Sequence, residues 1–177
     1  MMEFQITQEY LGQGTHLVYE APLFKEVLNA DPDSYRDEKG KGSTVAKVID
    51  GSLNNHSISG MAGVSNIGND INWTGHPFGQ ANWYAFGRIA WDYNLSSEKI
   101  ADEWIRQTFS NNKTVVDSVK RMMIVSREAV VNYMTPLGLH HIMGYGNHYG
   151  PAPWYDKAPR ADWNPVYFHR ADSIGIG

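Results

Sequence analysis

The stretch that decides the fold opens the chain and reads Glu3-Phe4-Gln5-Ile6-Thr7-Gln8-Glu9-Tyr10. Because side chains alternate along a strand, Phe4 and Ile6 lie on one face of it, and the other face is polar. Glu9 falls where this strand ends and its loop begins. In a β/α barrel such a position carries chemistry far more often than packing. The same alternation also fits a sheet edge that faces water, so the residues alone leave both interpretations open.

The first 92 residues alternate between predicted strands and helices. Pro22 suits the first turn of a helix, and Ser43 or Thr44 suits the cap of a short one. Residues 57–67 are predicted to form a buried strand crowded by its neighbours, and a helix is predicted over 77–92. This order is that of the last βα units of a parallel sheet or barrel. A whole barrel needs about 250 residues, more than the chain has.

The second part, residues 93–177, is predicted to be mainly helical. Ser96 or Ser97 caps a helix that ends near Phe109. A longer helix runs from about Thr114 to Met134. Its apolar stripe consists of Val116, Val119, Met123, Val130 and Met134. From Gly144 onward Gly, Pro, Trp, Tyr and His dominate, and only a short helix near 163–169 is expected. The predicted fold class is therefore α/β followed by mainly α, and the residues alone leave open whether the α/β part belongs to a parallel sheet or to an incomplete barrel.

The composition excludes several classes of function. A net charge of −4 gives no basic footprint for nucleic acid. The sequence has no apolar run of the roughly 20 residues that a membrane span needs. The absence of Cys excludes disulfides and thiolate metal sites. Aromatic residues make up 12% of the chain, which fits a surface that stacks on sugars but equally fits a large helical core.

Two other groups of residues resemble ligand sites only superficially. The glycine-bearing stretches 12–14, 40–42 and 63–68 lack the spacing of phosphate-binding loops. His140, His141 and His148 cluster in the sequence, but their spacing matches no zinc pattern. We favour hydrogen-bonded histidines in an aromatic-rich loop over a metal site, and a polar ligand pocket lined by them is a third alternative.

Glu9 is the strongest candidate for catalysis. Its neighbours Gln5, Thr7 and Gln8 are neutral hydrogen-bonding residues, so nothing nearby in the sequence neutralises its carboxylate. A general base needs an ionised carboxylate in such a setting, directed at water. Glycoside hydrolysis needs a second carboxyl group. The other candidate carboxylates are those of Glu20, Asp70 and Asp92, and none of them stands out as a general acid.

Several long stretches of the chain resemble one family of enzymes. They include residues 4–13, 41–51, 80–84, 129–143, 148–151 and 160–163, together with Asn72-Trp73-Thr74-Gly75-His76-Pro77. In this order they resemble the α-glucuronidases of glycoside hydrolase family 67, over essentially the whole chain. The resemblance implies that residues 1–92 are the C-terminal part of a catalytic (β/α)8 barrel. It implies that 93–177 belong to a helical C-terminal region ending in an aromatic, Pro- and Gly-rich segment.

The resemblance also implies an activity. Family members remove (4-O-methyl-)glucuronic acid α-1,2-linked to xylose in glucuronoxylan oligosaccharides, with inversion and without a metal or other cofactor. The carboxylate proposed to activate water falls on Glu9. Trp154 best matches a tryptophan thought to contact the xylose, and Trp163 is second. Homodimerisation through the helical region is implied for the intact enzyme, with neither nucleic acid nor membrane as a partner.

The chain lacks the first two thirds of the family pattern and stops before its end, so we expect an internal fragment. The general acid would precede it, so we expect the fragment to be inactive. Two barrel strands cannot close and leave strand edges unpaired, so we also expect the fragment to unfold without a sharp cooperative transition. Any signal for localisation would also lie upstream. Two alternatives remain: a non-catalytic helical module that binds carbohydrate or a partner, and a histidine-loop metalloprotein.

Overall fold

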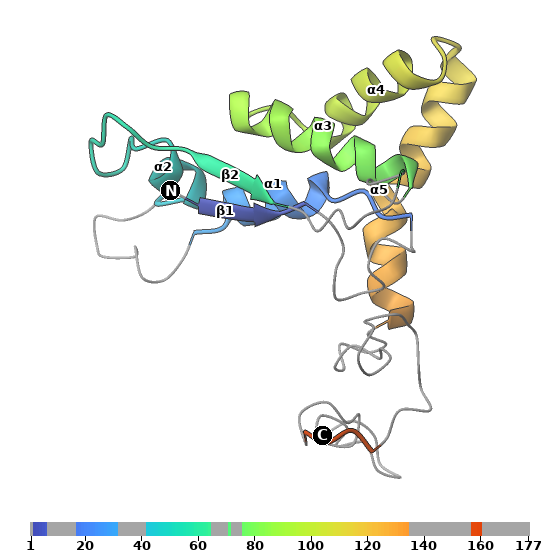
Figure 1. Cartoon of the computed structure of the whole chain (residues 1–177). Coiled ribbons are helices and arrows are strands. Elements are labelled where there is room, and N and C mark those ends of the chain that lie inside the picture. Colours follow the sequence, from blue (N-terminus) through green and yellow to red (C-terminus); the bar gives the residue numbers. More distant parts are fainter. Residues whose placement is uncertain are drawn as a thin grey trace.

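The computed structural model describes residues 2–6, 17–31, 42–64, 71, 76–134 and 157–160. These residues form a mixed, mostly helical structure with a small sheet (Figure 1). The elements in chain order are β1 (Met2–Gln5), α1 (Ala21–Asn29), α2 (Val45–Ile49), β2 (Met61–Val64), α3 (Pro77–Trp91), α4 (Ser97–Thr108) and α5 (Lys113–Met134). The predicted combination of a parallel strand pair with mainly helical structure is confirmed, whereas membership of an incomplete (β/α)8 barrel stays a prediction.

The two strands form a parallel pair. Their register aligns Met2 with Met61 and Gln5 with Val64. The pairing continues one residue further, where the Ile6 amide donates to the Val64 carbonyl at 2.8 Å. Phe4 and Ile6 are buried and Glu3 is exposed, so the alternation predicted for the opening strand is confirmed. Because the strands are parallel, their carboxyl ends lie at the same edge of the sheet.

The prediction that residues 57–67 form a buried strand is wrong in two respects. The strand is only four residues long, and its residues alternate between half-buried and exposed. Ile58 is 92% exposed and Val64 is 41% exposed. The reason is that the described helices pack on the face of β2 that carries Met61 and Gly63, and within the described residues the face with Ala62 and Val64 stays open. Of the two described glycines in this stretch, Gly63 is closely surrounded and Gly60 is not. A Cβ added to Gly63 would lie 2.4 Å from Ile6 Cδ1 and 2.7 Å from Phe86 Cε1.

The larger of two apolar clusters among the described residues joins the strand pair to the helices, and the smaller consists of Val18 and Val130. Phe4 of β1, Phe24 of α1 and Phe86 of α3 form a cluster of rings whose centroids lie 5.5 to 6.4 Å apart. In α4, Trp104 packs edge-on against Phe78 and Phe109. Aromatic pairs in such tilted geometries add to the stabilisation from burial. The core therefore contains residues from both sides of residue 92, and the division of the chain into two parts at that residue stays a prediction.

The helices begin largely where the sequence predicts. Pro22 lies in the first turn of α1, and the Thr44 hydroxyl, rather than that of Ser43, caps α2. The Ser96 hydroxyl accepts from the Lys99 amide at 3.2 Å and caps α4. Val116, Met123 and Val130 of the predicted stripe are buried. In Figure 1 the C-terminal half of α5 (orange) extends beyond the other described helices and strands.

Ion pairs tie the three long helices together at the surface. Arg88 of α3 makes a two-pronged contact with Glu103 of α4, at 2.9 and 3.3 Å. Lys120 of α5 pairs with Asp102 of α4 at 2.9 Å. These side chains are partly exposed, so each pair contributes only modestly to stability. The pairs link α3 with α4 and α4 with α5 at the rim of the shared core.

Candidate functional site

The candidate site is the carboxyl edge of the parallel strands, where the chain leaves β1 toward Glu9. Glu9 follows Ile6 by three residues. It lies outside the described residues, which resume at Leu17. The structure therefore describes the two ends of the segment that carries Glu9. One end is held by the sheet, through the bond from the Ile6 amide to the Val64 carbonyl.

The other end is held by Tyr19, which is fully buried. Its amide donates to Ser126 Oγ of α5 at 2.8 Å, and its phenol donates to the Ser97 carbonyl of α4 at 3.1 Å. The Ser126 hydroxyl in turn donates to the Met123 carbonyl at 2.6 Å. Burial strongly raises the pKa of the Tyr19 phenol, so it remains a neutral donor. Both bonds are shielded from water and position the backbone at residue 19.

Asn82 of α3 holds the neighbouring residues on each side. Its Oδ1 accepts from the Glu20 amide at 2.8 Å, and its Nδ2 donates to the Val18 carbonyl at 3.0 Å. Asn82 is buried, so both of its polar atoms are satisfied by this one strip of backbone. We call residues Leu17–Glu20 the anchor segment. Together, α3, α4 and α5 fix the point at which the segment carrying Glu9 rejoins the fold.

Glu20 is the one ionisable acid of the anchor segment. It is 2% exposed, and its Oε1 has no hydrogen-bond partner among the residues that the structure describes. Burial raises the pKa of its carboxyl to about 7, against an opposing effect of the nearby Arg127 guanidinium. A carboxyl group with such a pKa is a feature shared by functional and structural sites, so the shift alone does not assign it a role.

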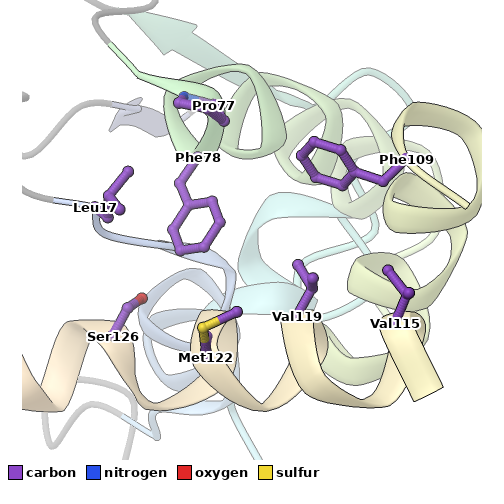
Figure 2. A pocket seen from close by; sticks show the side chains of 8 residues that line it. All are labelled: Leu17, Pro77, Phe78, Phe109, Val115, Val119, Met122 and Ser126. Carbon is purple, nitrogen blue, oxygen red and sulfur yellow. The ribbon is translucent and has the colours of Figure 1, made fainter.

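An apolar groove of about 450 Å³ borders the anchor segment (Figure 2). Phe78 points from the start of α3 toward α5, whose Val119 and Met122 lie opposite, and Leu17 closes one end. The Ser126 hydroxyl also lines the groove, but it is already engaged with Tyr19 and Met123. No carboxylate or imidazole is among its lining residues in the described part of the chain. The groove therefore offers apolar contact and no hydrolytic chemistry.

Most of the residues singled out from the sequence lie outside the described residues. These are Glu9, Trp154, Trp163, Asp70, His140, His141 and His148. Asp92 is described, and its Oδ1 accepts from the Asn94 amide at 3.0 Å, which stabilises the turn after α3. Within the described ranges no three or more acidic or histidine side chains cluster in a way that could hold a metal ion. In the same ranges no helix is long and apolar enough to cross a membrane.

Two residues that hold the anchor segment were not predicted, although the sequence carries a signal for them. Asn82 lies four residues after Phe78 and three before Ala85, on the buried face of α3. Ser126 lies three residues after Met123 and four before Val130, on the apolar stripe of α5. A polar residue on the apolar face of a helix must find a buried partner. Here the partner of each is the backbone of the anchor segment.

Comparison with known proteins places these features in a family. Residues 1–73 match the glycosyl hydrolase family 67 middle domain, and residues 74–177 match the glycosyl hydrolase family 67 C-terminus. Alpha-glucuronidase A of Emericella nidulans is 41% identical over 177 residues, which cover 99% of this chain and 20% of that protein. Alpha-glucuronidase A of Aspergillus tubingensis is 38% identical, over 99% of this chain and 21% of its own.

A third relative, the probable alpha-glucuronidase A of Aspergillus clavatus, is 39% identical over 86% of this chain and 18% of its own. The chain thus spans about a fifth of the length of the curated relatives that it matches. The two family models together account for all of its residues. The chain therefore belongs to glycosyl hydrolase family 67.

Proposed function

We propose that the chain is part of an inverting α-glucuronidase. The intact enzyme would hydrolyse the α-1,2 link between (4-O-methyl-)glucuronic acid and xylose in glucuronoxylan oligosaccharides. Residues 1–92 would be the C-terminal part of its catalytic barrel, and residues 93–177 part of a helical C-terminal region that supports a homodimer. Alone, the 177 residues would be inactive, because the general acid would lie in the part of the enzyme that precedes them.

The observation that carries this proposal is the parallel pairing of β1 and β2, whose carboxyl ends lie at the same edge of the sheet. In the sequence, Glu9 follows the last residue of β1 by four positions. In β/α folds this edge is where active sites are built. The names of the relatives, alpha-glucuronidase A, support the choice of reaction.

In the proposed reaction Glu9 acts as a general base. Its carboxylate takes a proton from water, and the water oxygen attacks the anomeric carbon of the glucuronic acid on the face opposite the xylose. A general acid elsewhere in the enzyme protonates the departing xylose oxygen. In inverting glycosidases the two carboxyl groups stand about 6.5–9.5 Å apart to admit that water. Trp154, and secondarily Trp163, would stack on the xylose ring.

The anchor segment would contribute to this chemistry through position. The bonds from Tyr19 and Asn82 fix one end of the segment that carries Glu9, and β1 fixes the other. A base must be held within hydrogen-bond reach of the water that it activates, and errors of about 1 Å can lower the rate about 100-fold. The helices that hold Tyr19 and Glu20 at one end, and the strand pair at the other, would serve this requirement.

A chimera tests the proposal. The homologous segment of the Emericella nidulans enzyme is replaced by residues 1–177, and release of glucuronic acid from aldouronic acids is measured. The chimera should be active, and Glu9→Gln should lower kcat by about 100-fold or more, as expected for loss of a general base. Glu128→Gln changes an exposed glutamate on α5 and should leave kcat unchanged.

Two results would count against the assignment. Near-normal turnover by the Glu9→Gln chimera would remove Glu9 from the reaction. Activity of the isolated 177 residues would show that the general acid lies within them.

If Trp154→Ala raises KM while kcat stays close to that of the parent chimera, the proposed contact with xylose is supported.

A further inference from the structure

The carboxyl group of Glu20 lies in an interface between three helices. Glu20 immediately precedes α1, its amide is bonded to Asn82 of α3, and the adjacent Tyr19 is bonded to Ser126 of α5. It does not cap α1 with its side chain, and within the described structure its Oε1 has no hydrogen-bond partner. A buried oxygen without a partner favours the neutral acid over the carboxylate.

Arg127 is the charged group of α5 that acts on Glu20. It follows Ser126 directly, and its field lowers the pKa of Glu20 while burial raises it. From α1, Lys25 lies nearest in sequence, but its ammonium group donates to the Tyr93 carbonyl. From α3, the residue in contact is Asn82, which carries no charge. Arg127 is therefore the cation able to pair with an ionised Glu20.

Arg127 already has one carboxylate partner on α1. Its guanidinium lies 3.6 Å from Glu26 Oε2. This contact is longer than a good charge-assisted hydrogen bond, which is about 2.7–2.9 Å. The Glu26 side chain is 66% exposed, so the pair is weak and readily rearranged. One guanidinium on α5 thus contacts an exposed acid of α1 and acts electrostatically on the buried acid that directly precedes this helix.

We propose that Glu20, Arg127 and Glu26 form a proton-controlled contact between α1 and α5. When Glu20 is protonated, Arg127 pairs with Glu26, and the buried acid is neutral. When Glu20 releases its proton to solvent, Arg127 moves toward Glu20 and leaves Glu26. The switch acts at the anchor segment, and it does not depend on the reaction that the intact protein catalyses.

The direction of the pH effect follows from linkage. The folded-state pKa of Glu20, about 7, lies above the ordinary value of 4.5, so between these values the folded chain binds more protons than the unfolded one. Stability contributed by the protonated form is complete below about pH 4.5 and is lost as the pH rises to about 7. Near neutral pH the contact is therefore poised between its two states.

Nuclear magnetic resonance of the 177-residue chain tests the switch directly. Carboxyl carbons of ¹³C-labelled glutamate are followed from pH 4 to 9, and the Glu20 signal is assigned by its loss in Glu20→Gln. We expect one glutamate to titrate near pH 7 and the Arg127 Nε signal to shift with the same midpoint. In Glu20→Gln the Arg127 shift near pH 7 should vanish, and Arg127→Gln should move the Glu20 midpoint upward by about one pH unit.

Two further variants separate the switch from a general effect of charge. Glu26→Gln removes the competing partner, so the Glu20 midpoint should fall. Glu128→Gln removes an exposed acid next to Arg127 in sequence and should change neither signal. The proposal is overturned if every glutamate titrates near its ordinary value, as would also happen in an unfolded chain. It is equally overturned if Glu20 titrates near pH 7 while the Arg127 signal stays constant.

Discussion

The helical part of the chain, α3 to α5, buries its apolar side chains more completely than the strand pair does. In α4, Ile100, Trp104 and Ile105 are buried against neighbouring helices. In β2, by contrast, Ala62 and Val64 are exposed. The helices therefore provide much of their own core, whereas in the part of the chain that the structure describes the sheet has one face covered and the other open. The two regions thus differ in how much of their apolar surface they bury.

The physical reason lies in how each kind of element completes its hydrogen bonds. A helix satisfies its backbone internally and needs only one packed stripe. Parallel strands usually have both faces covered and need partners at both edges. The described sheet is a two-stranded pair, and the chain spans about a fifth of its relatives. Among the described residues, the outer edges of β1 and β2 therefore lack strand partners.

The largest expected effect in the helical part comes from Trp104. Its side chain is 3% exposed and packs against Phe78 and Phe109. Trp104→Ala should therefore destabilise the helices by about 3–5 kcal/mol, measured as the urea dependence of helical circular dichroism. If the helices owe their stability to this core, the variant should lose most of its helical signal at low urea concentration.

Trp91 provides the matched control, because it ends α3 and is 87% exposed. Trp91→Ala should change stability by no more than about 0.5 kcal/mol. Equal effects of the two substitutions would contradict the described core and remove the distinction between the helical part and the strand pair.

A smaller effect is expected in the strand pair, at Gly63. A Cβ at this position would meet both Ile6 and the Phe86 ring, so Gly63→Ala should separate β2 from its neighbours. Overpacking of this kind costs about 1–3 kcal/mol. The amide of Ile6, which donates to Val64, should then exchange with solvent at least about tenfold faster. The helical circular dichroism should remain close to that of the unmodified chain.

Gly60 is the control for this substitution, since nothing lies within 4 Å of its Cβ position. Gly60→Ala should leave the exchange of the Ile6 amide within a factor of about two, as for a neutral surface change. A Gly63→Ala variant that also lost its helical signal would show that the two regions unfold together, against the distinction drawn above.

Local patterns in the sequence predicted the elements but not what surrounds them. The alternation of Phe4 and Ile6 and the stripe of Val116, Met123 and Val130 correctly predicted buried faces, because each depends on period alone. The exposure of Val64 was missed, since burial of a strand depends on partners distant in sequence. The roles of Asn82 and Ser126 were missed for the same reason: their bonding partner is backbone more than 60 residues away.

The smallest changes in stability are expected from removing the caps of α4 and α2. They test whether the helical part unfolds separately from the region near the strands. The Ser96 hydroxyl caps α4, a helix of 12 residues with one buried face. Because Ser96 itself is exposed, Ser96→Ala removes the cap and little else, and should lower the stability of the helical part by about 1 kcal/mol.

Thr44 caps α2, which has only five residues, and its bond to the Lys47 amide is long at 3.4 Å. So short a helix depends on tertiary contacts more than on its own ends. Thr44→Ala should therefore shift the urea midpoint of the helical signal by an amount equivalent to about 0.5 kcal/mol or less. A larger shift, matching that of Ser96→Ala, would mean that α2 unfolds together with α3 to α5 and that the stable unit extends toward the strands.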